Sequence, residues 1–139
     1  MSIEQGAHLR GRFWRQILQE LVEQNEMWAA VLTDFQGLPF AAALHPNWRA
    51  QKDFEECQHI INILAAFAPP LLRLSRQMEN YVGAFQADEI SLRTAQGARI
   101  VSRFVPGEPT QQLILTVLVP PYQTYRRAMN QALRQLQHI

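Results

Sequence analysis

The segment from Phe54 to Met78 carries apolar residues around more of a helix than one small domain can cover. Placed at 100° per residue, these residues fill an arc of roughly 200°. They are Phe54, Cys57, Ile60, Ile61, Ile63, Leu64, Phe67, Ala68, Leu71, Leu72, Leu74 and Met78. A helix on the surface of one domain needs a stripe only somewhat wider than ~100°. The excess predicts a second protein over part of this helix, and a second copy of the chain is the simplest candidate.

Length and composition predict one globular domain spanning residues 1–139. The chain is 47% hydrophobic and 18% charged, which is typical of a folded protein. Its formal net charge of +1 leaves no overall basic excess for neutralising phosphates, which argues against a dedicated DNA binder, and we expect no nucleic-acid partner. Cys57 is the single cysteine, so no disulfide forms within the chain, and its place on the apolar arc predicts a buried side chain.

The sequence also predicts a cytoplasmic protein without a membrane span. Its first residues lack the basic and apolar regions of a signal peptide. The longest apolar run, Ile60–Leu72, is interrupted by Asn62 and Pro69–Pro70 and is too short to cross a bilayer.

The N-terminal part predicts a helix followed by a β-hairpin. One face of Ala7–Gln24 is apolar, as in an amphipathic helix. The continuous apolar run in Met27–Asp34 is typical of a central strand, and Leu38–Leu44 follows as its hairpin partner after a turn closed by Gly37. Pro39 favours an edge position for the second strand.

The middle of the chain is predicted to be a loop and then the long helix. The loop begins at His45 and ends at Asp53, which has the side chain to cap the helix that follows. Pro69–Pro70 removes two backbone donors and predicts a kink or a break, with the second piece ending near Glu79. We expect a short extended connector over Asn80–Ala87.

Three further strands and a last helix complete the prediction. The strands are Asp88–Thr94, Ala98–Val105 and Leu113–Val119, with a polar loop over Pro106–Gln112 between the last two, and the helix is Tyr122–Ile139, with Pro121 at its start. The two wholly apolar strands should lie in the middle of the sheet and the alternating ones toward an edge. Helices must then cover both faces of the sheet.

No motif in the sequence indicates catalysis, a cofactor or a metal. The glycines form neither a phosphate-binding loop nor a dinucleotide fingerprint, and the four histidines lack metal-ligand spacing. Glu55 and His59 are one helical turn apart and are interpreted as a polar pair rather than as metal ligands. We therefore expect a protein that is not an enzyme.

The stretch from Val31 to Ala41 contains a hairpin with the pattern Asp34-x-x-Gly37-hydrophobic-Pro39. Together with the order of the predicted elements, this hairpin resembles the roadblock/dynein light chain family. The resemblance runs from about Leu9 to Leu136. It implies an α+β fold, a three-layer α/β/α sandwich. One long helix covers one face of a five-stranded antiparallel sheet, and the two terminal helices cover the other.

The resemblance also implies a dimer, formed with a second copy or with a paralogue. In the family, long helices pair and sheets join through the third strand, which is Asp88–Thr94 here. The corresponding interface residues are Cys57, Ile60, Ile61, Leu64, Phe67, Ala68, Leu71, Ile90 and Leu92. The implied function is that of a non-enzymatic regulator or scaffold for a small Ras-like GTPase.

Two polar surfaces are candidates for binding a further partner. Gln58, His59 and Asn62 form the polar remainder of the long helix. Arg126, Arg127 and Arg134 lie on a last helix without acidic residues, where they form either a solvated face or a dock for an acidic protein or for the surface of an anionic membrane. The alternative functions are an assembly adaptor for a motility, secretion or motor complex without a GTPase and, more distantly, a small-molecule sensor.

Overall fold

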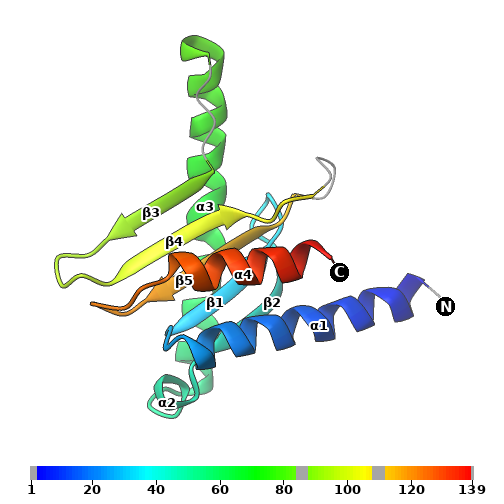
Figure 1. The fold of residues 1–139 in the computed structure, drawn as a ribbon, viewed down its shortest axis with the longest axis vertical. Coiled ribbons are helices and arrows are strands. Elements are labelled where there is room, and N and C mark those ends of the chain that lie inside the picture. The colour runs from blue at the N-terminus through cyan, green and yellow to red at the C-terminus, as the bar shows by residue number, and fades with distance from the viewer. Residues whose placement is uncertain (1–2, 84–87, 108–111, 139) are drawn as a thin grey trace.

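The computed structural model describes residues 3–83, 88–107 and 112–138, and in these ranges five strands and four helices form three layers (Figure 1). The elements in chain order are α1 (Ile3–Gln24), β1 (Ala29–Thr33), β2 (Pro39–Leu44), α2 (Pro46–Arg49), α3 (Phe54–Val82), β3 (Glu89–Arg93), β4 (Arg99–Phe104), β5 (Ile114–Val119) and α4 (Arg126–Gln137).

The strands form one antiparallel sheet in the order β2-β1-β5-β4-β3. The two wholly apolar strands, β1 and β5, are neighbours inside the sheet, because side chains that are apolar on both faces must be covered on both faces. β2 and β3 are the two edges, as Pro39 and the alternation in β3 predict.

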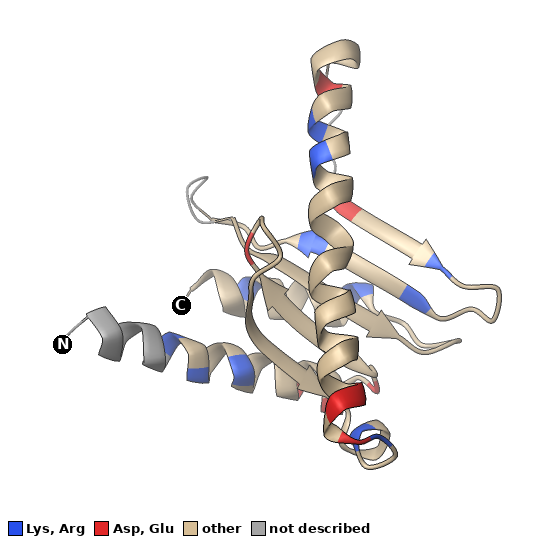
Figure 2. Ribbon diagram, turned by 180° about the vertical axis from the view of Figure 1, so that it is seen from behind, with Lys and Arg blue, Asp and Glu red and all other residues tan. Residues whose placement is uncertain are grey.

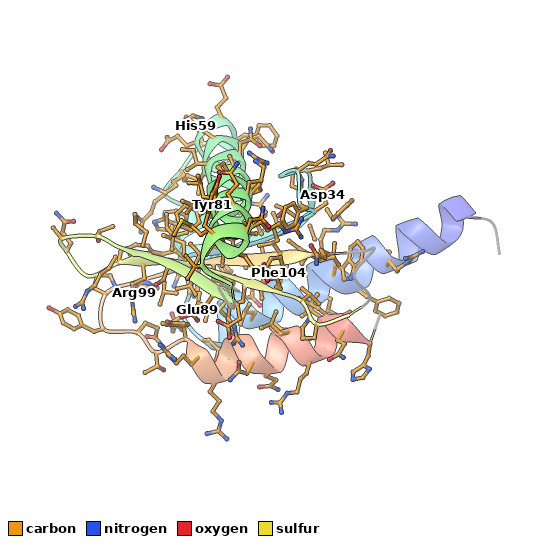
Figure 3. The ribbon with its side chains drawn as sticks, turned by 90° about the horizontal axis from the view of Figure 1, so that it is seen from above. Asp34, His59, Tyr81, Glu89, Arg99 and Phe104 are labelled. Atoms are coloured by element: carbon orange, nitrogen blue, oxygen red, sulfur yellow. The ribbon has the colours of Figure 1, made fainter. Side chains whose placement is uncertain are left out.

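Helices cover both faces of the sheet. α1 and α4 pack on one face around a core that includes Leu18, Leu115 and Met129, and α3 packs on the other face over Ala29 and Val31. Figure 3 shows these layers edge-on, with α3 above the sheet and the terminal helices below it. The predicted α+β sandwich is confirmed.

The turn between β1 and β2 is closed by Asp34. Its Oδ1 accepts hydrogen bonds from the backbone N–H groups of Gln36, at 2.8 Å, and Leu38, at 2.9 Å. Gly37 takes a φ of +90°, which side chains rarely adopt, and the strand register shifts between Leu32 and Thr33. These features confirm the predicted turn at Gly37, and the register shift marks a β-bulge beside it.

Helix α3 begins where Asp53 caps it and continues without a break to Val82. The Asp53 Oδ1 accepts a hydrogen bond from the Glu56 N–H at 2.8 Å. The expected break at Pro69–Pro70 is wrong, because both prolines lie inside one continuous helix. Pro69 is buried against the hairpin turn, so packing compensates for the lost backbone bond.

Two other middle segments differ from the prediction. Pro46–Arg49 forms the short helix α2 inside the expected loop, because Pro46 suits the first helical turn and the His45 Nδ1 accepts a hydrogen bond from the Asn47 N–H at 3.2 Å. Asn80–Val82 belongs to α3 rather than to an extended connector. Gly83 caps α3 through a hydrogen bond from its N–H to the Glu79 carbonyl. Residues 84–87 of the connector and residues 108–111 of the expected polar loop lie outside the described residues.

The first and last helices begin at different residues from those predicted. α1 already begins at Ile3, whereas α4 begins only at Arg126. Tyr122 has a φ of +67°, which is not helical. Arg99 holds the segment before α4, since its Nη2 donates to the carbonyl of Pro120 at 3.1 Å and to that of Gln123.

Candidate protein-interaction surface

Helix α3 carries a stripe of apolar side chains that lie exposed on its side away from the sheet. We call these residues the outer stripe. Their exposed fractions are 51% for Ile63, 37% for Leu71, 56% for Leu74, 45% for Met78 and 88% for Tyr81. Residues seven apart return to nearly the same side of a helix, and this spacing joins the half-buried Ile60 and Phe67 to Leu74 and Tyr81. A seven-residue apolar repeat is typical of a helix that pairs with another helix.

The inner side of α3 is used within the protomer. Cys57, Leu64 and Ala65 are buried with the α3-facing residues of β1, and Ala68 and Leu72 are buried with Ile114 of β5. The inner and outer sides together account for the wide apolar arc of this helix, because one side packs on the sheet and the other faces outward.

The structure divides the nine predicted interface residues into three groups. The buried ones are Cys57, Leu64 and Ala68; the half-buried ones are Ile60, Ile61, Phe67 and Ile90; the exposed ones are Leu71 and Leu92. The buried three pack against the sheet of their own protomer, so their side chains offer little surface to a second molecule.

Four residues of the outer stripe were not among the predicted interface residues. They are Ile63, Leu74, Met78 and Tyr81. The seven-residue spacing in the sequence is the signal that could have selected Leu74 and Tyr81. The last turns of α3 project beyond the sheet, which Figure 1 shows at the top of the molecule, and no sequence pattern states where the sheet ends.

The edge strand β3 lies beside the middle of α3. It pairs with β4 alone among the described strands, and Ser91, Leu92 and Arg93 are exposed. Ile90 packs in the same cluster as Ala68 and Leu72 of α3. The outer stripe and the unpaired edge are therefore close enough in the fold to belong to one surface, and Figure 2 shows α3 crossing this face of the sheet next to β3.

The six predicted partner-binding residues do not come together. Gln58, His59 and Asn62 are exposed on α3, where the Gln58 Nε2 donates to the Asn62 Oδ1 at 3.3 Å. Arg126, Arg127 and Arg134 are exposed on α4, which lies on the opposite face of the sheet. They are two separate surfaces.

The other terminal helix, α1, also carries exposed arginines, on its side toward β2 and α3. α1 and α4 pack together on one face of the sheet, and Arg12 and Arg15 are exposed on α1. Part of the charge on α4 is compensated, because the Arg126 Nη2 lies 3.9 Å from the Glu89 Oε2. α4 is therefore basic with one acidic contact at its start, whereas α1 carries Glu20 and Glu23 as well as its arginines.

Chemically reactive groups do not gather in the described part of the chain. Across residues 3–83, 88–107 and 112–138, no three His, Cys, Asp or Glu side chains lie close enough to hold a metal ion. One His–carboxylate contact joins the His45 Nε2 to the Glu26 Oε2 at 3.2 Å. In the same ranges, no helix is both long enough and apolar enough to cross a membrane.

Comparison with known proteins identifies the fold through structure alone. Neither a protein-family model nor a curated protein sequence matches the chain. MglB of Myxococcus xanthus matches with a TM-score of 0.70 and 12% identity, over 92% of this chain and 87% of that one. An MglB with a tetrameric arrangement matches with a TM-score of 0.73 and 13% identity, over 93% of this chain and 88% of that one.

A roadblock/LC7 domain from Streptomyces avermitilis also matches, with a TM-score of 0.65 and 14% identity, over 88% of this chain and 90% of that one. The likeness extends over nearly the full length of each protein. At such low identity it establishes the shared fold and assigns no function.

Proposed function

We propose that this chain, which has the roadblock fold, is a non-enzymatic dimeric regulator or scaffold that binds a small Ras-like GTPase in the cytoplasm. The observation that carries the proposal is the outer stripe of α3. A stripe with this spacing that stays exposed in the protomer favours a helix from another molecule as its cover. The GTPase enters through the resemblance to roadblock proteins.

In the proposed dimer, the α3 helices of two copies pair through the outer stripe and their sheets join at β3. Leu74 and Met78 would lie at the centre of the helix contact, and Leu92 would lie where the two edge strands meet. The contact is isologous, because each copy contributes the same residues and the assembly closes as a pair. The MglB with a tetrameric arrangement supports self-association as a property of this fold.

The GTPase would bind to the polar flank of the paired helices. Gln58, His59 and Asn62 are exposed outside the outer stripe, so pairing through the stripe would leave them free to bind. The arginines of α4 are on the far face of the sheet and would remain free for an acidic protein or an anionic membrane surface.

Light scattering tests the dimer. At micromolar concentration we expect a mass twice the 16.0 kDa of one chain. Leu74→Asp would place a charge in the helix contact and leave monomers. The control, Leu38→Asp, changes a leucine of similar exposure on the β1–β2 hairpin, 59% against 56%, and should remain dimeric. A monomeric wild type, or a dimeric Leu74→Asp, would refute the proposed interface.

Nucleotide-dependent binding tests the GTPase. The Ras-like GTPases encoded in the same genome would be loaded with GDP or with a non-hydrolysable GTP analogue and captured on the immobilised protein. We expect capture to depend on the nucleotide and to weaken in His59→Ala. If no GTPase were captured, or if the GDP- and GTP-analogue-loaded forms were captured equally, regulation of a GTPase would be excluded. The dimer would then be an assembly adaptor.

A further inference from the structure

The sheet has a second edge, β2, and that edge opens into a groove of about 1010 Å³. One wall is the side of α1 that carries Arg12 and Arg15. The other wall is formed by the start of α3, with Phe54, and by Arg49 and Lys52 just before it. The floor is β2 from residue 42 to residue 44. The edge strand is therefore recessed between the two helical layers.

Every charged side chain that lines the groove is a cation. Arg12, Arg15, Arg49 and Lys52 belong to the lining, and no carboxylate does. None of the four forms an ion pair with a carboxylate among the described residues. The Lys52 Nζ lies 4.6 Å from the ring centre of Trp48, which holds the ammonium group in place without neutralising it. The lining is complementary to an acidic occupant.

The backbone of β2 offers hydrogen-bonding groups on the groove side. The His45 N–H donates to the carbonyl of Trp28, so His45 directs its N–H toward β1. Neighbouring residues of a strand alternate in direction, which turns Leu44 and Ala42 outward. The Leu44 carbonyl accepts from the Gln19 Nε2 of α1 at 3.4 Å, as expected of an outward group. Ala42 is the next outward residue, and its methyl group is too small to cover the strand edge.

Apolar surface lies beside the charges. Phe13 of α1 is 52% exposed and Phe54 of α3 is 79% exposed, and both line the groove. A strand directs alternate side chains to opposite sides. A strand lying here would direct one set of side chains toward α1 and the other toward α3, so each set would meet an aromatic ring and at least one cation.

We propose that this groove binds an extended acidic segment of a partner protein, which adds to the sheet as a strand beside β2. Its backbone would pair with the outward groups of Ala42, its carboxylates would lie among the four cations, and its apolar side chains would pack on Phe13 and Phe54. Strand addition takes affinity from the backbone and specificity from the side chains. Pro39, at the start of β2, limits the pairing to the residues after it.

The groove is separate from the proposed dimer interface. Of the three residues proposed to bind the GTPase, Gln58 also lines the groove, whereas His59 and Asn62 do not. β2 and β3 are opposite edges of the sheet, so joining two sheets at β3 leaves β2 free. On α3, Phe54 and Ile63 are about 180° apart at 100° per residue, so the groove and the outer stripe use opposite sides of the helix. A chain that failed the light-scattering or GTPase test could still bind an acidic strand.

Selection from a display library of random linear peptides tests the proposal on the full chain. We expect the enriched peptides to be acidic with alternating apolar residues. The best one would then be synthesised and its Kd measured. Reversing two charges in the groove, Arg12→Glu with Arg15→Glu, should weaken binding at least about tenfold. The matched reversal on α4, Arg126→Glu with Arg127→Glu, should change the Kd less than about twofold.

Amide hydrogen exchange distinguishes strand addition from charge attraction. The Ala42 N–H should exchange more slowly when the synthetic peptide is bound. The proposal would be overturned if no peptides were enriched or if the enriched peptides were neutral or basic. It would also be overturned if both double charge reversals weakened binding equally, or if peptide binding left the exchange rate of the Ala42 N–H unchanged. Binding to phosphatidylserine vesicles that depends on Arg12 and Arg15, without peptide enrichment, would overturn it in favour of a lipid-binding groove.

Discussion

The carbonyl oxygen of Ala65 on α3 lies against Gly37 of the β1–β2 hairpin turn. A Cβ atom on Gly37 would be 3.2 Å from this oxygen and 3.6 Å from the Cγ of Pro69. In a regular helix the Ala65 carbonyl would accept a hydrogen bond from residue 69, and a proline has no N–H to donate. The hairpin thus packs where the helix lacks a backbone hydrogen bond.

Gly37→Ala should lower the free energy of unfolding by about 1 to 3 kcal/mol. The alanine would have to adopt a φ of +90° and would press its methyl group on the Ala65 carbonyl. Urea denaturation at a fixed protein concentration measures the loss. Gly107→Ala is the control, since no atom lies within 4 Å of its added Cβ and its φ is outside the positive range. Equal losses in the two variants would contradict this account.

Pro70→Ala should raise the free energy of unfolding by about 1 to 3 kcal/mol, because it supplies a backbone donor inside α3 at an exposed position. Pro69→Ala should gain less, since the ring of Pro69 is buried beside Gly37 and its packing would be lost. Thermal unfolding of both variants provides the comparison. A less stable Pro70→Ala protein would show that α3 requires this proline.

The buried hydroxyl pair between β4 and β5 should be strongly coupled. The Ser102 Oγ and the Thr116 Oγ1 are 2.6 Å apart, and the two residues are 3% and 1% exposed. Thr116→Val should cost about 1 to 3 kcal/mol because it leaves the serine hydroxyl without a partner. Adding Ser102→Ala should cost little more, and a double-mutant cycle measures the coupling. Additive losses would mean that the hydroxyls do not depend on each other.

Removing the cap of α3 should destabilise the start of the long helix. Asp53→Ala should lower the free energy of unfolding by about 0.5 to 2 kcal/mol. Asp53→Asn should retain most of this stability, because an amide oxygen also accepts a hydrogen bond from the Glu56 N–H. Amide exchange in the first turn of α3 would show where the loss occurs. Similar losses in both variants would assign the effect to the charge rather than to the cap.

Much of the fold was predictable because each element carries a local signal. The continuous apolar runs of β1 and β5 required cover on both faces, and Asp34 and Gly37 specified the turn between β1 and β2. The predicted break at Pro69–Pro70 was wrong for a physical reason. The free-energy cost of a proline in a helix can be judged from the local sequence, but the packing that offsets this cost comes from a hairpin distant in the sequence. The late start of α4 likewise depends on Arg99, which is far from it in the sequence.

The interaction surface was less predictable. The sequence shows that α3 is apolar on too many sides, but it does not show which side its own sheet takes. Leu64 and Leu74 are both leucines on the predicted arc, and the structure buries one at 2% exposure and leaves the other at 56%. The β2 groove left no signal at all, because its cations come from α1 and from the segment before α3, which meet only in the folded chain.

The projecting end of α3 affects how long the protein would survive in a cell. Met78, Tyr81 and Val82 are exposed there, so a lone copy has few tertiary contacts to hold the last turns helical. Segments of this kind open at low free-energy cost, and proteases cleave opened chains. In the proposed dimer the same turns would be covered. Surplus unpaired copies would then be degraded first, and the amount of protein would adjust to the number of copies that have found a partner.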